Sequence, residues 1–254
     1  MLGRLLSHLC AVVAFAQTPL APKDESLFSR LEKIEMEALW AALNGEGYTS
    51  QFIHELNPLH TNRRMIGRAR TVRYLPNRPD LRERLYAKSP QLNYVSAEQA
   101  EPGDILVFDA GGDTRSAVTG VMTTRRFVYR GGRGMVADGA FRDIPNMREL
   151  PIQVYLRRGQ ASSVSPNLLS ADYQVPVRVA NTTVVPGDIL IGDEHGILVV
   201  PAAMIEKIAA KAEETSEKEA FMEELLKRGA PIPEVYPRLS EANQKKFDAA
   251  KKKK

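Results

Sequence analysis

Cysteine is nearly absent from this chain, which has one, Cys10, among 254 residues. One cysteine cannot form a disulfide within the chain, nor can it build a zinc site of the kind that needs several cysteines. The chain also has only four histidines. Any metal ion must therefore be bound mainly by oxygen ligands or by a histidine nitrogen.

A charge excess of one sign is also missing from most of the chain. The formal net charge is +4, but Lys251 to Lys254 supply four positive charges, and the remaining 31 basic residues balance 31 acidic ones. Outside this tail the sequence lacks the basic stripe that is typical of nucleic-acid-binding proteins. We therefore expect no nucleic-acid partner.

No stretch of the sequence approaches the ~20 apolar residues that span a bilayer. A shorter apolar run, Leu5 to Phe15, follows Arg4, and Ala14 to Ala16 has the small-residue spacing that signal peptidases accept. Residues 1–16 are thus predicted to be a signal peptide. The protein would then be exported, to the periplasm or outside the cell, with no membrane association after cleavage. The alternative is a hydrophobic N-terminal helix of a cytoplasmic protein.

Hydrophobic periodicity predicts helices and strands in alternation. Ile66 to Leu75 is expected to be a strand with one face in water, because arginines interrupt its apolar residues. The expected helices are one amphipathic helix over 26–43, one short helix within 80–100, a long helix over 204–226 and a charged terminal helix over 240–254.

One motif occurs twice, as P-G-D-I-L-x-x-D-x-x-G, at Pro102 to Gly112 and at Pro186 to Gly196. A Pro-Gly pair sets a tight turn, and the apolar run after it predicts a strand buried on both faces. We therefore expect two related strands in one sheet system. Together with the predicted helices, they indicate a mixed α/β domain of several layers.

Two sets of residues between these motifs have side chains or amides that could bind a ligand. Thr119-Gly120 leads into a predicted helix, 121–130, whose first amides would favour an anion, although many such helix ends bind only water or a cap. Arg142 and Asp143 follow a predicted strand. The guanidinium can bind a carboxylate and the Asp oxygens a hard cation; the alternative is a plain surface ion pair.

These motifs, taken in order, resemble one family. A strand, GGD, a glycine-led helix, a strand, DGAFRD and then PGDIL with GDEHGILVVP are similar to the 4-hydroxy-4-methyl-2-oxoglutarate aldolases and ribonuclease-activity-regulator-like (RraA-like) proteins, over about 27–214. The resemblance implies an α/β fold, a swivelling β/β/α domain with layered sheets and flanking helices, here at 26–215. It also implies a homotrimer or hexamer with active sites between subunits. Residues 216–254 would be a helical, charged C-terminal extension.

The resemblance also implies roles for particular residues. Arg142 and Asp143 would be catalytic, with Arg142 binding the substrate and Asp143 binding Mg²⁺ or Mn²⁺. The substrate pocket would be lined by Gly120, Val121, Met122 and Thr123. The implied reaction is class II retro-aldol cleavage or decarboxylation of a small 2-oxo acid, giving pyruvate through a metal-stabilised enolate.

The chain departs from the family at one position. The enzymes carry an acidic residue twenty-one positions before the arginine, where this chain has Val121, and valine cannot exchange a proton or orient a water. Asp113 and Asp138 are possible substitute acids. The alternative is a non-catalytic RraA-like binding or regulatory protein. Arg125 and Arg126 either extend the anion pocket or form a solvated helix face.

Overall fold

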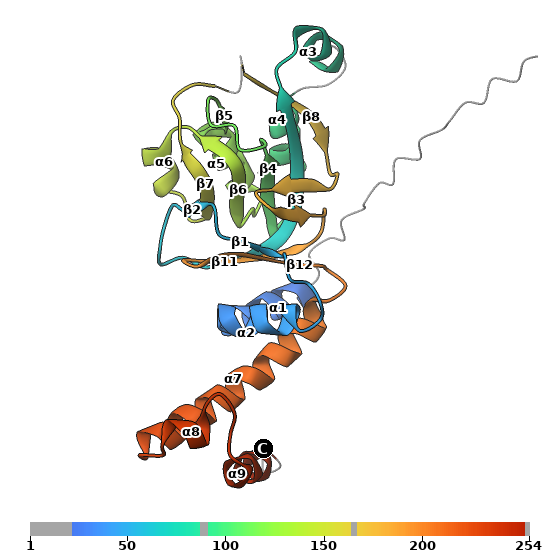
Figure 1. Cartoon of the computed structure of the whole chain (residues 1–254). Helices are drawn as coiled ribbons and strands as arrows, with labels where there is room; N and C mark the ends of the chain where they lie inside the picture. The colour runs from blue at the N-terminus through green and yellow to red at the C-terminus, as the bar shows by residue number, and fades with distance from the viewer. Residues whose placement is uncertain (1–21, 87–90, 164–166, 252–254) are drawn as a thin grey trace, which may run out of the picture.

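The computed structural model describes residues 22–86, 91–163 and 167–251 (Figure 1). The predicted signal peptide lies outside these residues. The described chain is a mixed α/β structure with a large sheet and flanking helices, which confirms the predicted fold class. The helices are α1 (Pro22–Leu31), α2 (Met36–Asn44), α3 (Pro79–Tyr86), α4 (Leu92–Glu98), α5 (Val121–Tyr129), α6 (Ile144–Arg148), α7 (Ile205–Lys227), α8 (Ile232–Val235) and α9 (Glu241–Lys251). The strands are β1 (Phe52–Ile53), β2 (Asn57–Pro58), β3 (Met65–Pro76), β4 (Asp104–Asp109), β5 (Ala117–Thr119), β6 (Gly134–Phe141), β7 (Gln153–Gly159), β8 (Leu168–Tyr173), β9 (Val177–Val179), β10 (Thr182–Val184), β11 (Ile189–Asp193) and β12 (Gly196–Val200).

The main sheet has the strand order β1-β12-β11-β3-β4-β6-β7-β2, while β5 also pairs with β6 and β8 with β3. Strands β3, β4, β6 and β7 are parallel, and β11 is antiparallel to β3. The two copies of the repeated motif supply β4 and β11, which both pair with β3. The prediction of related strands in one sheet system is therefore confirmed.

The turns before β4 and β11 share one geometry. Gly103 and Gly187 have φ of 91° and 92°, a conformation that favours glycine. The next residue in each copy, Asp104 or Asp188, accepts a hydrogen bond from the amide three residues earlier, at 2.8 Å in both cases. The repeated sequence therefore encodes one turn used twice.

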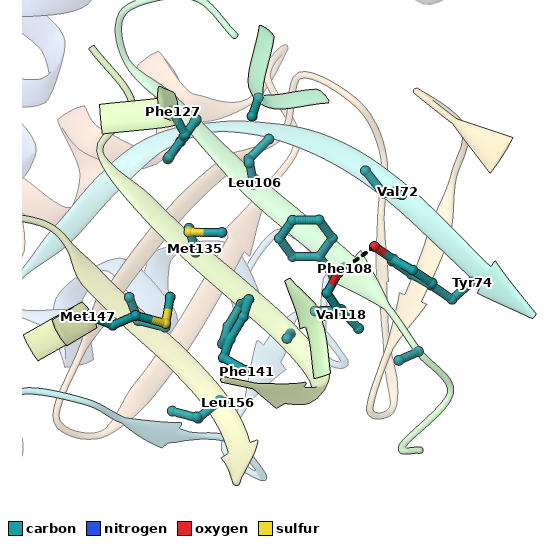
Figure 2. Packing of buried hydrophobic residues seen from close by; sticks show 14 of the residues in the cluster. Val72, Tyr74, Leu106, Phe108, Val118, Phe127, Met135, Phe141, Met147 and Leu156 are labelled. Atoms are coloured by element: carbon teal, nitrogen blue, oxygen red, sulfur yellow. Dashed lines mark hydrogen bonds between the residues drawn. The ribbon is translucent and has the colours of Figure 1, made fainter. Parts of the chain in front are cut away.

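Side chains of β4 alternate between two hydrophobic clusters, so the strand is buried on both faces as predicted. Ile105 and Val107 pack beside β9 and β10, whereas Leu106 and Phe108 pack under α4, α5 and α6. Figure 2 shows the second cluster, in which the rings of Phe108 and Phe141 pack edge to face with their centroids 5.9 Å apart. This contact fixes the end of β6 within the core.

The prediction that β3 has one face in water is wrong. Arg68 and Arg70 are only 6% and 5% exposed, because both guanidinium groups face the fully buried carboxylate of Asp104. The Arg70 Nε lies 2.7 Å from Asp104 Oδ2. A buried arginine is tolerated when its charge is paired and hydrogen-bonded, and here its partner lies on the neighbouring strand.

Two helix predictions also need correction. Residues 26–43 form parts of two helices, α1 and α2, and the guanidinium of Arg64 binds the carbonyl oxygen of Ile34 in the break between them, at 2.5 Å. The apolar period continues across the break because both helices contribute to one core cluster with α7. Residues 80–100 likewise contain two helices, α3 apart from its first residue and all of α4, where one was expected.

The C-terminal helices extend away from the sheet. Figure 1 shows α7 leading outward, with α8 at its far end and α9 turned back alongside it, where Lys251 pairs with Glu214. Met222, Val235, Leu239 and Phe247 form a separate small cluster there. Because α7 runs through residue 215 without a break, the predicted division at 215/216 stays a prediction. Within the described ranges, none of the helices has both the length and the apolar character needed to cross a membrane.

Candidate active site

The parallel pairing of β5 with β6 brings two sequence-predicted segments together. Both strands run in the same direction, so Gly120 after β5 lies beside Arg142 and Asp143 after β6. A Cβ atom on Gly120 would be 2.5 Å from Arg142 Nε and 2.6 Å from Asp143 Oδ2. Only glycine allows this approach.

Asp143 has a left-handed backbone, with φ 60° and ψ 34°. Its Oδ2 accepts a hydrogen bond from the Val121 amide at 3.0 Å and lies 3.6 Å from Arg142 Nε. The side chains of Arg142 and Asp143 are 45% and 36% exposed. The carboxylate is thus held at the start of α5 while part of it stays open to solvent.

The start of α5 retains two amide donors. The Val121 amide is used by Asp143, and Thr124 closes the first turn by donating from its backbone and its hydroxyl to the carbonyl of Gly120. In the part of the chain that the structure describes, the amides of Met122 and Thr123 have no protein partner. They remain available to an anion, an arrangement that helix N-termini favour.

A cavity of about 390 Å³ opens at this point, and eleven residues line it. Four of the predicted substrate-binding residues are among them: Gly120, Met122, Thr123 and Arg142. Val121 is not, because its side chain packs against the hydrophobic cluster under α5.

Sequence reasoning missed the opposite wall of the cavity. Gln91, Asn93 and Tyr94, at the start of α4, and Ser163 line it. These residues follow no motif, and their segment reads as a mixed polar connection. The parts of the site that were predicted lie on the glycine-marked turns, where local sequence has a distinctive pattern.

The charges around the cavity are few. Arg142 is the single cation among the eleven lining residues, and none of the eleven is acidic. Asp113 and Asp138, the possible substitute acids, line two other cavities.

Both of those aspartates have protein partners. Asp113 binds Arg115, with Nη2 to Oδ2 at 2.6 Å, and this side-chain hydrogen bond holds the pKa of Asp113 below its ordinary value. Asp138 is 4% exposed and accepts hydrogen bonds from Arg157 and from the Ala180 amide. It thereby ties the turn between β9 and β10 to β6. Neither carboxylate faces the Arg142 cavity within this chain.

The two arginines along α5 also lie outside the cavity lining. Arg126 pairs with Glu98 of α4 at 2.8 Å, and both side chains are about half exposed. The Arg125 guanidinium lies 3.9 Å from the sulfur of Met122. In this chain they form a solvated helix face.

A metal ion at this site would have to rely on few protein ligands. Across the described ranges, no three histidine, cysteine, aspartate or glutamate side chains gather closely enough to hold an ion. Asp143 offers its second carboxylate oxygen, since only Oδ2 is used by the Val121 amide. A single carboxylate suits Mg²⁺, which keeps several waters and is often bound through one or two carboxylates.

A model described as RraA-like, Aldolase/RraA, matches residues 37–199, which is more than half of the chain. The chain belongs to the RraA-like family.

Named relatives fall into two groups. The chain is 30% identical over 158 residues to a putative 4-hydroxy-4-methyl-2-oxoglutarate aldolase of Halalkalibacterium halodurans, covering 62% of this chain and 69% of that protein. It is 31% identical over 138 residues to a 4-hydroxy-4-methyl-2-oxoglutarate aldolase of Thermus thermophilus, covering 54% and 76%. Among solved structures, Streptomyces coelicolor RraAS2, described as an unusual member of the RNase ES inhibitor RraA protein family, has a TM-score of 0.72 and 28% identity, covering 80% of this chain and 98% of that one.

Proposed function

We propose that this protein is a divalent-metal-dependent lyase that cleaves a small 2-oxo acid to release pyruvate. The observation that carries the proposal is that Arg142 and the amides of Met122 and Thr123 line one cavity beside Asp143. The aldolase names of the relatives support a lyase activity at the family level.

The substrate carboxylate would bind between Arg142 and the start of α5. The guanidinium supplies charge-assisted hydrogen bonds, and the helix dipole adds positive potential at the same place. The carboxylate and the neighbouring 2-oxo group would thereby be oriented toward Asp143.

Asp143 would hold Mg²⁺ or Mn²⁺ through its free carboxylate oxygen, with waters completing the coordination. When bound, such an ion supplies a Lewis acid that polarises the 2-oxo group. The left-handed backbone of Asp143 and its bond to the Val121 amide keep the carboxylate in place. The chain itself therefore contributes orientation and charge.

We propose a homotrimer or hexamer with the cavity near a subunit boundary, as family resemblance suggests. Met122 and Tyr94, two cavity-lining residues, are 71% and 50% exposed in the single chain, which supports a covering partner. Light scattering on the purified protein measures the assembly. Sequencing of the mature N-terminus tests the proposed export.

The direct test is pyruvate release. Purified protein with Mg²⁺ or Mn²⁺ is given oxaloacetate and a panel of 4-hydroxy-2-oxo acids, and pyruvate is followed with a coupled dehydrogenase. We expect metal-dependent release that is lost on chelation and in Arg142→Ala. If folded, oligomeric protein releases no pyruvate from any compound of the panel, the proposed lyase activity is contradicted.

A second candidate is a non-catalytic binding or regulatory protein of the same family. The observation in its favour is that none of the described residues lining the cavity is acidic, and that Val121, where the family resemblance implies an acid, is an apolar side chain packed against the hydrophobic cluster under α5. Under this reading the cavity binds a 2-oxo acid in the presence of metal, and no turnover follows.

A further inference from the structure

Two buried polar atoms of residues that line this cavity have no hydrogen-bond partner among the residues that the structure describes. The side chains belong to Asn93 and Thr119, which are 3% and 5% exposed, and the atoms are Asn93 Oδ1 and Thr119 Oγ1. Both residues line the same cavity as Arg142. Leaving a buried polar atom unpaired costs free energy, and native proteins rarely do so without a reason.

The backbone carbonyls of both residues already have partners, so they do not account for the unpaired side-chain atoms. The Asn93 carbonyl accepts from Ser96, and the Thr119 carbonyl accepts from the Arg142 amide. Thr124, which is buried but does not line the cavity, has its hydroxyl paired with the Gly120 carbonyl at 3.0 Å. Both unpaired side-chain atoms belong to residues that line the cavity.

The chemistry of these groups selects a ligand. A carboxamide both donates and accepts hydrogen bonds, and a threonine hydroxyl does the same. The matching ligand group is a hydroxyl. A second carboxylate on the ligand would need a second cation, and among the lining residues Arg142 alone is cationic.

We propose that Asn93 and Thr119 bind the hydroxyl groups of a 2-oxo acid with a neutral, polyhydroxylated tail, of the 2-keto-3-deoxy sugar acid class. This inference rests on the proposed lyase site, with Arg142 holding the carboxylate. In cleavage the C3–C4 bond breaks, the C4 hydroxyl loses its proton and C4 becomes an aldehyde. The bonding electron pair stays on C3 as an enolate, which takes up a proton to give pyruvate.

The test measures binding as well as turnover. Full-length protein with Mg²⁺ is titrated calorimetrically with pyruvate, which lacks the hydroxylated tail, with 2-keto-3-deoxygluconate, and with 4-hydroxy-4-methyl-2-oxoglutarate, which carries a second carboxylate. We expect 2-keto-3-deoxygluconate to bind most tightly. Thr119→Val and Asn93→Leu should each weaken its binding about tenfold, the equivalent of about 1.4 kcal/mol, and leave pyruvate binding within about twofold.

Thermal unfolding separates this role from a structural one. Thr119→Val removes an unpaired hydroxyl and should leave the melting temperature unchanged or higher, whereas the matched change Thr124→Val breaks a made hydrogen bond and should lower it.

The outcomes divide cleanly between the two proposals. Pyruvate binding without a preference for the sugar acid, or equal loss of both ligands in the variants, overturns the hydroxyl site and leaves the lyase standing. Binding of the sugar acid without any cleavage overturns the lyase alone. Failure of all three ligands to bind overturns both.

Discussion

Asp143 has two separable roles, one in the backbone and one in charge, and two substitutions distinguish them. Asp143→Asn keeps an oxygen that can accept from the Val121 amide, and asparagine tolerates the left-handed φ of 60°. Asp143→Ala loses the acceptor and places a Cβ-bearing residue with no polar side chain at that φ. Both remove the charge on which the proposed metal site depends.

The sizes of the effects follow from the contacts. In Asp143→Ala the lost hydrogen bond and the unfavourable backbone each cost about 1 kcal/mol. Partial exposure of the site reduces the first, because water can reach the freed amide. We expect a net loss of about 1–2 kcal/mol, which is roughly 2–6 °C in melting temperature for a chain of this size. Asp143→Asn should change the melting temperature by less than about 2 °C.

The assay pairs thermal unfolding with pyruvate release. Both variants should lose metal-dependent release by at least about 10³-fold, equal to about 4 kcal/mol of transition-state stabilisation. In Asp143→Asn the stabilisation of the fold by added Mg²⁺ should also disappear. Metal-dependent turnover that survives in Asp143→Asn refutes the assignment of Asp143, and equal melting temperatures for the two variants refute the backbone argument.

Three further predictions test other parts of the molecule. Burial raises the pKa of the Asp188 carboxyl to about 6. The stability that this group contributes is therefore present below pH 3.8 and is lost as the pH rises through 6. In urea unfolding, Asp188→Asn should stabilise the protein by up to about 3 kcal/mol at pH 8 and have little effect at pH 4. The same change in the first copy of the motif, Asp104→Asn, removes the carboxylate charge that faces the buried Arg70 and should cost about 3–5 kcal/mol, so matching effects at the two sites contradict the structure. Phe247→Ala should loosen α9, seen as faster proteolysis near the C-terminus, at a local cost of about 3 kcal/mol, while pyruvate release stays the same.

The sequence was most informative where short motifs constrain the backbone. Pro-Gly turns followed by apolar runs predicted β4 and β11, and the glycine at 120 with Arg142 predicted one wall of the cavity. Each of these signals is local, so a single segment of sequence contains it.

The misses have non-local causes. Arg70 alternates with apolar residues as a wet strand face would, and only the contact with Asp104, on another strand, makes its burial tolerable. Asn93 belongs to no recognisable motif in the sequence. Only the fold brings it to the cavity that Arg142 also lines. The break between α1 and α2 depends on Arg64, thirty residues farther along.

The position of β3 also governs how the molecule can assemble. Its partner strands β8 and β11 lie about a hundred residues farther along the chain, with Leu75 paired with Leu169 and Gly67 paired with Leu190. Such distant pairings slow folding, and until they form β3 has an open edge on which another chain can add a strand. The protein is therefore most open to strand addition by another chain before β8 and β11 are in place.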